Sequence, residues 1–309
     1  MQKELKRWDM KRVITEWGDV DLNMKNPWKG RKDYQFFFLG NSLYSKDKKK
    51  LLSPMYNAEF DTWSGYYNTS INGFVNDAII LMHSQDTKTM LHDIPFCVSA
   101  FKRICDRNMN LTPILKGMNT KKILGSMAYY DLYNKWYKIL YTIGYCAMFF
   151  RNKIFMDFLA KKKNLFLFYA HPNDKRLGIN CSSSYAVNTL NGPHRFTGNN
   201  FIGCMLMSIR DAYLMKKERK EGQEERSFKI TVSCKKGFML VDYFASLLCL
   251  YGYSEWSSTV SYVCDEDAVI ISCLLPNTSN ISNMLSDITE ELSLYPDSEI
   301  VAVLRKILL

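Results

Sequence analysis

The chain has 309 residues, of which 47% are hydrophobic, and a formal net charge of +10. This length allows two domains, and the hydrophobic content excludes global disorder. The positive charge favours an anionic partner, a nucleotide or a nucleic acid, although the abundance of Lys also explains it as ordinary solvated surface.

The first 30 residues are charged and carry three tryptophans. They predict a short helix and then an extended arm that ends at 27–30. The aromatic run 34–39 predicts a strand, because aromatic residues are enriched in strands. The lysine-rich segment 41–50 that follows predicts a solvated loop.

A buried helix is expected in the next part of the chain. The segment 71–74 predicts a tight turn, and the apolar run 75–82 after it predicts the helix. Asn76 and Asp77 would stand at its start, where amide and carboxylate side chains satisfy free N–H groups. A helical pattern also covers 94–124.

The middle of the chain alternates apolar runs and polar loops. The long apolar stretch 129–159 predicts two helices. The run 165–170 predicts a strand, and 201–213 predicts an apolar helix. Two polar loops, 171–180 and 192–200, lie between this strand and this helix. Polar groups at the ends of apolar elements are typical of binding sites, so we expect a ligand between these two loops.

The mixed-charge segment 216–226 predicts a linker and a domain boundary. The residues beyond it follow a β-α-β-β-α pattern, with strands expected at 228–232, 258–264 and 268–275 and helices at 238–251 and 281–294. We therefore predict an α+β protein with an N-terminal arm (1–30), an α-rich domain (31–218) and a small C-terminal α+β sandwich (226–309).

The nine cysteines form no C-x-x-C pair, and the four histidines are scattered. Such cysteines argue for a reducing compartment and against a disulfide framework, and we expect neither a metal site nor a cofactor. The N-terminus lacks the apolar core of a signal peptide, and no stretch of about 18 uncharged apolar residues occurs. We therefore expect an intracellular protein, cytoplasmic or nuclear, with no membrane span.

Two motifs in the middle of the chain carry a resemblance to a known family. The first, at 169–179, is the end of an apolar strand followed by Asp174 and a glycine. The second, at 196–203, reads aromatic, glycine, asparagine and again glycine, and a Leu-Met pair and Arg210 follow. Together they resemble the NADAR superfamily (NAD- and ADP-ribose-associated domains, also called YbiA-like).

The resemblance covers roughly residues 31–215 and implies a NADAR-like fold there. It implies a ligand of the ADP-ribose or ribosyl-nucleotide type, and hydrolysis of an N-glycosidic bond by an N-glycosidase or ADP-ribosyl-nucleobase hydrolase. Two positions depart from the family pattern, because Leu177 and Phe196 stand where the family prefers Trp. In the helix after residue 73, Asn76 stands at the position of a family Glu and His83 at that of a Lys.

The catalytic candidates are therefore Asp174, Asp77 and Asn76. Cleavage of an N-glycosidic bond develops positive charge on the sugar, which a carboxylate stabilises while it or another group activates water. Asp77 supplies a carboxylate if the alignment shifts by one residue. If Asn76 truly replaces the Glu, the alternative is a catalytically degenerate protein that binds a nucleotide or nucleic acid, or acts as a scaffold.

The residues assigned to ligand binding are spread over the whole predicted domain, and they are Asn199, Asn200, Gly198, Arg210, Phe196, Trp136, Arg176, His83 and Asn152. Several have a second interpretation that the sequence leaves open. Asp174 either serves the reaction or forms an Asx turn with its own backbone. Arg210 binds a phosphate, pairs with Asp174 or forms another structural salt bridge. Asn199 and Asn200 either cap a helix or mark an anion site at its N-terminus.

Overall fold

The structure, a computed structural model, describes residues 7–18, 26–38, 51–63, 67–86, 126–218, 225–233, 237–251, 260–262, 268–276 and 301–306. This part of the chain is helix-rich and of the mixed α+β class. It divides into two compact units, which are Met1–Tyr56 with Lys153–Leu214 (unit 1) and Asn57–Asn152 with Met215–Leu309 (unit 2). Each predicted domain (1–30, 31–218 and 226–309) is one continuous segment, whereas each unit combines two separate segments of the chain. The predicted domain boundaries stay a prediction.

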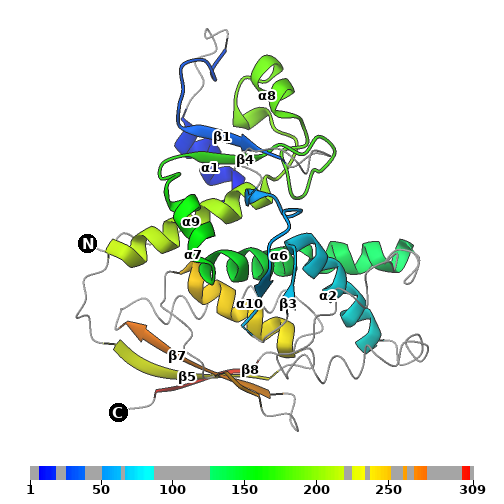
Figure 1. The fold of residues 1–309 in the computed structure, drawn as a ribbon, viewed down its shortest axis with the longest axis vertical. Helices are drawn as coiled ribbons and strands as arrows, with labels where there is room; N and C mark the ends of the chain where they lie inside the picture. Colours follow the sequence, from blue (N-terminus) through cyan, green and yellow to red (C-terminus); the bar gives the residue numbers. More distant parts are fainter. Residues whose placement is uncertain are drawn as a thin grey trace. The chain divides into compact units, whose positions relative to one another are not determined.

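The centre of unit 1 is a two-stranded parallel sheet of β1 (Tyr34–Phe37) and β4 (Phe166–Tyr169) (Figure 1). Tyr34 is paired with Phe166, and Phe37 is paired with Tyr169. All four residues of β4 are buried, which explains why its sequence is a continuous apolar run rather than an alternating one.

The outer edge of β4 is satisfied by α9 (Phe201–Glu218) and the residue before it, not by a third strand. The Asn200 amide accepts from the Tyr169 N–H (2.9 Å) and donates to the Leu167 carbonyl (2.9 Å). The Leu167 N–H points at the sulfur of Met207 (3.4 Å). A Cβ at Gly203 would overlap the Leu167 carbonyl, so a glycine there allows α9 to approach the strand this closely.

The N-terminal segment packs on the same sheet through aromatic rings. Helix α1 (Met10–Trp17) begins after Asp9, whose side chain accepts from the Arg12 N–H as a helix cap. The Trp8 indole N–H donates to Asp211 on α9 (2.7 Å). The rings that meet edge to face, tilted or stacked around β1 and β4 are Trp17, Trp28, Tyr34, Phe36, Phe166, Phe168 and Phe196.

Unit 2 contains the helices α2 (Ile71–Asp86) and α6 (Ser126–Phe150), which pack against each other, and a short hairpin of β2 (Phe60–Asp61) and β3 (Tyr67–Asn68). The predicted turn at 71–74 is wrong, because α2 already begins at Ile71. The Ser70 hydroxyl accepts from the Gly73 N–H (3.0 Å) and thus caps the helix. Asn76 and Asp77 consequently lie in the second turn of α2 and do not cap it.

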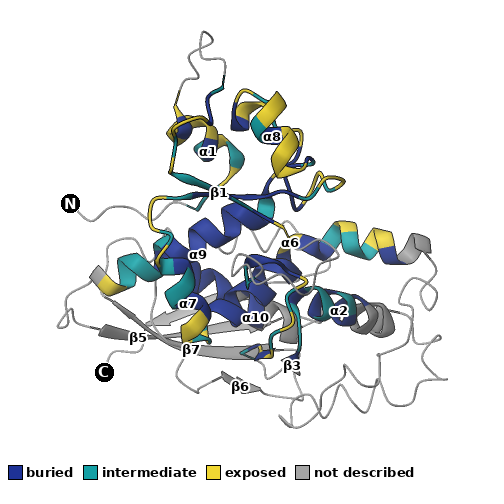
Figure 2. Cartoon of the chain, turned by 45° about the horizontal axis from the view of Figure 1, so that its top comes forward, coloured by how far each residue is buried: buried dark blue, intermediate teal, exposed yellow. Residues whose placement is uncertain are grey.

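The C-terminal part of unit 2 contains the helix α10 (Gly237–Leu250) and the strands β5 (Glu225–Ser233), β6 (Val260–Tyr262), β7 (Ala268–Pro276) and β8 (Val301–Lys306). The strands form an antiparallel sheet in the order β6-β7-β5-β8. Helix α10 packs against β5, β7 and α6, which explains why it is apolar on all sides. In Figure 2, α10 is buried over much of its described length.

The predicted strands and first helix of this region lie within three residues of the observed ones. The stretch 129–159 does form two helices, α6 and α7 (Lys153–Ala160), which are separated by residues 151–152. Helix α8 (Ser183–Thr189) and the 3-10 turn η2 (Pro193–Arg195) were not expected, because that region reads as a polar loop. The predictions for 41–50, 94–124 and 281–294 lie outside the described residues. Among the helices that are described, none is long and apolar enough to cross a membrane.

Candidate functional site

The two polar loops after β4 and before α9 are joined by backbone hydrogen bonds. The Asn199 N–H donates to the Lys175 carbonyl (2.8 Å), and the Asn200 N–H donates to the Gly178 carbonyl (2.9 Å). The Ile202 N–H, in the first turn of α9, donates to the Leu177 carbonyl (3.1 Å). These three amide groups are therefore not available to an anion.

Asp174 forms the Asx turn that the sequence left open. Its Oδ1 atom accepts from the N–H groups of both Arg176 and Leu177 at 2.8 Å. Within the described chain, the second carboxylate oxygen has no hydrogen-bond partner. Asp174 is half-buried and Arg176 is exposed, so both side chains border solvent.

Asn200 has a structural role. It is 0% exposed, its backbone is left-handed (φ 46°), and both atoms of its amide are bonded to the backbone of β4. A ligand would have to displace those bonds to reach it. The neighbouring Asn199 has an exposed side chain, and Gly198 is buried. A Cβ on Gly198 would overlap the Gly178 carbonyl, so this glycine serves the close approach of the two loops.

Arg210 is also structural in unit 1. It is 3% exposed, and its Nε donates to Asp211 at 2.8 Å. Its Nη1 donates to the carbonyls of Lys162 (3.0 Å) and Leu165 (2.6 Å), in the turn between α7 and β4. The pairing of Arg210 with Asp174 is therefore wrong, and the salt-bridge interpretation is correct, with Asp211 as the partner. Because a guanidinium has five N–H donors, it can join a carboxylate to two carbonyls at once.

Phe196 follows η2 and belongs to the aromatic cluster of unit 1. Its ring stacks on Trp28, with centroids 6.0 Å apart and an interplanar angle of 22°. It also meets Phe168 edge to face at 5.2 Å. A side chain held on two sides in this way is part of the core that supports the loop.

The other catalytic candidates lie in unit 2. The Asn76 amide oxygen accepts from the Tyr129 hydroxyl of α6 (2.6 Å). Asp77 is 7% exposed, and its Oδ2 accepts from the amide of Asn68 (2.7 Å). Burial, and secondarily the charge of Tyr130, raises the pKa of Tyr129, so this phenol stays a neutral donor to Asn76.

Three remaining candidates also belong to unit 2. Trp136 is buried on α6, with the ammonium of Lys135 5.7 Å from its ring centroid. Asn152 is half-buried between α6 and α7, and its N–H donates to the Phe149 carbonyl. His83 lies on α2, and its side chain is outside the described part of the structure.

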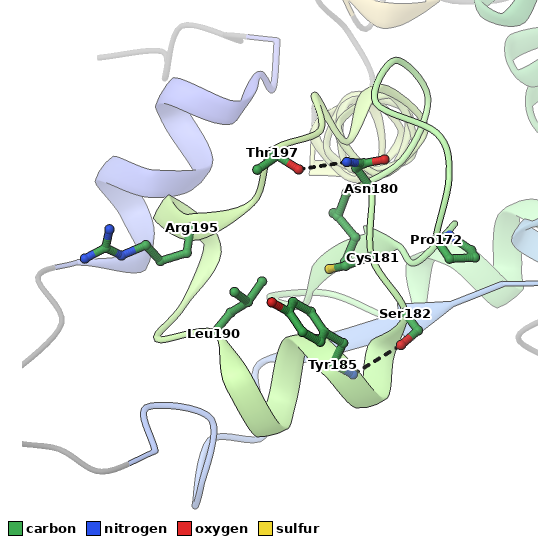
Figure 3. Close-up of a pocket in the computed structure, with 9 residues that line it drawn as sticks. Pro172, Asn180, Cys181, Ser182, Tyr185, Leu190, Arg195 and Thr197 are labelled. Carbon is green, nitrogen blue, oxygen red and sulfur yellow. Dashed lines mark hydrogen bonds between the residues drawn. The ribbon is translucent and has the colours of Figure 1, made fainter.

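Unit 1 contains an open pocket of about 490 Å³ between the two loops (Figure 3). Helix α8, which connects the loops, forms one wall with Tyr185, and Leu190 follows directly after it. The Thr197 hydroxyl accepts from the Asn180 amide (2.9 Å), and this bond joins the two loops above the pocket. The lining residues are Pro172, Ile179, Asn180, Cys181, Ser182, Tyr185, Leu190, Arg195 and Thr197.

None of the residues predicted from the sequence to bind or act on a ligand lines this pocket, although two of them, Phe196 and Gly198, are direct sequence neighbours of residues that do. The wall instead offers an amide, hydroxyls, a thiol, an exposed tyrosine ring and a guanidinium. Burial raises the pKa of the Cys181 thiol, so this group stays protonated and unreactive at neutral pH. The one local signal that pointed here is Ser182, whose hydroxyl caps α8 by accepting from the Tyr185 N–H (3.2 Å).

The charge around the pocket is positive. Among the described residues that line it, none is acidic, and Arg195 has no acidic partner within hydrogen-bond distance. In Figure 3 the Arg195 side chain extends toward α1 and away from Tyr185, so it flanks the rim. The exposed Lys175 lies on the neighbouring loop. Nowhere in the described chain do three or more His, Cys, Asp or Glu side chains gather in a way that could hold a metal ion.

The fold and this pocket define a helix-rich α+β protein with an open pocket in unit 1 that has both polar and apolar walls and one cation, Arg195, at its rim. No family model and no curated protein matches the chain. The functional conclusion therefore depends on the chemistry of the pocket and on the motifs of the sequence.

Proposed function

We propose that the unit 1 pocket binds a ribosylated nucleotide of the ADP-ribose type, and that the α-rich part of the chain has a NADAR-like arrangement. The pocket volume of about 490 Å³ carries this proposal, since it lies within the usual range for sites that bind small molecules and cofactors. The composition of the wall agrees with it. Hydroxyl and amide groups suit a ribose, and a cation at the rim suits a phosphate.

Two side chains are assigned the main contacts. Tyr185 is 52% exposed at the pocket wall and offers a flat ring for a base to stack on. Arg195 reaches a phosphate by rotating its flexible side chain from the rim into the opening, where a guanidinium binds two phosphate oxygens at once. Asn180 and Thr197, already bonded to each other, present their remaining donor and acceptor positions to the sugar.

The test is calorimetric titration of the full chain with ADP-ribose. Arg195→Gln removes the rim cation and is expected to weaken binding about tenfold or more, because charged hydrogen bonds contribute about 1.5–3 kcal/mol. Tyr185→Ala is expected to weaken binding, whereas Tyr185→Phe keeps the ring and the affinity. Lys161→Gln, an exposed cation outside the pocket, is the matched control and should leave the affinity unchanged.

Three results would contradict the proposal. The first is the absence of ADP-ribose binding by the unaltered chain. The second is an equal loss of affinity in Arg195→Gln and Lys161→Gln, which would indicate a nonspecific charge effect. The third is a steep salt dependence of binding to random RNA that exceeds any affinity for ADP-ribose, which would favour a nucleic-acid-binding protein instead.

N-glycosidic hydrolysis is the second candidate, and one observation favours it. The Oδ2 atom of Asp174 has no hydrogen-bond partner in the described chain, so one oxygen of this half-buried carboxylate remains for a sugar or a water molecule. Against it, no acidic residue lines the pocket among the described residues. We therefore propose ligand binding as the primary function. If neither substrate is hydrolysed, the chain is a catalytically degenerate protein that binds its ligand without turnover.

The hydrolysis test uses ADP-ribosylated guanine in DNA and a ribosylamino-pyrimidine phosphate as substrates. Asp174→Asn is the appropriate variant, because the Asn amide oxygen still accepts the two N–H groups of the turn while the charge is lost. Product from the unaltered chain and none from Asp174→Asn would support a catalytic carboxylate. Equal product from both would exclude Asp174, and no product from either, together with ADP-ribose affinity, would leave the binding function alone.

A further inference from the structure

Helix α8 is a pocket wall that has little support of its own. It has seven residues, far fewer than the roughly 12–15 that an isolated helix needs for marginal stability in water. Five of the seven are exposed, and only Ala186 is buried (Figure 2). Burial of apolar surface therefore contributes little to holding it, although it carries Tyr185 into the pocket wall.

The last turn of α8 is bonded to the N-terminal segment of the chain. A helix leaves its final carbonyl groups without partners inside the helix. Here the Asn26 amide donates to the Val187 carbonyl (3.3 Å), and the Trp28 indole N–H donates to the Leu190 carbonyl (2.8 Å). The Asn26 Oδ1 atom in turn accepts from the Trp28 backbone N–H (2.9 Å), so the two anchors form one rigid group.

Trp28 also holds the opposite side of the pocket. Its ring is 2% exposed and stacks on Phe196, the residue between the lining residues Arg195 and Thr197. One buried side chain thus contacts both walls, by a hydrogen bond on the α8 side and by ring stacking on the η2 side.

We infer that Asn26 and Trp28 are the positioning residues of the unit 1 pocket, and that α8 stays folded as its wall only while they hold its last turn. Loss of these anchors exposes two carbonyls to water and leaves this seven-residue helix with the Ser182 cap and the burial of Ala186. The pocket is therefore coupled to the docking of the N-terminal segment. The consequence for ligand affinity rests on the proposed function, whereas the anchoring itself does not.

Hydrogen exchange of the α8 amides measures the anchoring directly. Trp28→Phe keeps an aromatic ring and deletes the N–H donor, and Asn26→Asp keeps the acceptor for Trp28 and deletes the donor to Val187. The matched control is Trp17→Phe, a buried tryptophan of the same aromatic cluster that has no hydrogen bond to α8 in the described chain. Exchange of the α9 amides reports any global loss of stability.

We expect exchange at 186–190 to be about five- to tenfold faster in Trp28→Phe and in Asn26→Asp than in Trp17→Phe, the ratio that corresponds to one net hydrogen bond. ADP-ribose affinity should fall in the same two variants and not in the control. Equal α8 exchange in all three variants would overturn the inference. If the unaltered chain does not bind ADP-ribose, the proposed function fails, but the exchange comparison still decides whether α8 depends on these anchors.

Discussion

Replacing Asn200 distinguishes a structural residue from a ligand-binding one. Asn200→Gly keeps the left-handed backbone at φ 46° without strain and deletes both amide bonds to β4. The Tyr169 N–H and the Leu167 carbonyl then lie buried without partners, at a cost of about 1–3 kcal/mol each. Since water enters part of the gap, we expect the free energy of unfolding to fall by about 2–4 kcal/mol.

The assay is urea unfolding followed by tryptophan fluorescence, in which the midpoint shifts while the slope stays constant. Asn199→Gly is the matched control, because it makes the same chemical change at an exposed neighbouring side chain, and its cost should stay below about 1 kcal/mol. Equal stability of the two variants, with ADP-ribose affinity lost only in Asn200→Gly, would refute the structural role and restore the ligand-binding one.

Gly203→Ala should lower the free energy of unfolding by about 2 kcal/mol or more, because the added Cβ overlaps a carbonyl of β4, and an unchanged urea midpoint would contradict this. Arg210→Lys is expected to cost about 2–4 kcal/mol in the same assay, since an ammonium cannot replace the planar guanidinium bonded to Asp211 and two carbonyls. The hydrogen bond from Arg31, and then its charge, lowers the pKa of Asp33 against the opposing effect of burial. Arg31→Gln should therefore raise the pKa of Asp33 toward its ordinary value in an NMR titration. A lowered carboxyl pKa stabilises the fold above about pH 4, and this contribution is lost as the pH falls through the folded pKa. The difference in the free energy of unfolding between the unaltered chain and Arg31→Gln should therefore shrink in acid.

Elements with strong local patterns could be predicted from the sequence. The alternation in β5 and the apolar run of α10 place both elements within three residues of their observed bounds. The apolar run of β4 also predicts a buried strand. In contrast, α8 is composed mostly of residues with modest helix propensity and is anchored by side chains about 160 positions away in sequence, so apart from the Ser182 cap no local pattern predicts it.

The candidate site was predicted less well than the fold. The expected place, between the loops at 171–180 and 192–200, does contain a pocket, but none of the predicted residues lines it, and only Phe196 and Gly198 adjoin lining residues in the sequence. The motif contains Gly198, Asn200 and Gly203 because two loops, a strand and a helix approach closely at these positions. A motif of this kind indicates tight packing as readily as it indicates ligand contact.

By itself, the sequence determined the mixed α+β class, the buried strand after residue 165 and the positions of three strands and one helix between residues 225 and 276, because each depends on the spacing of apolar residues along the chain. Only the tertiary structure decided the partners of polar groups. It assigned Arg210 to Asp211, Asp174 to an Asx turn, and the end of α8 to Asn26 and Trp28. The physical reason is that a buried polar group must find a hydrogen-bond partner wherever the fold places one, and spacing along the chain does not specify that place.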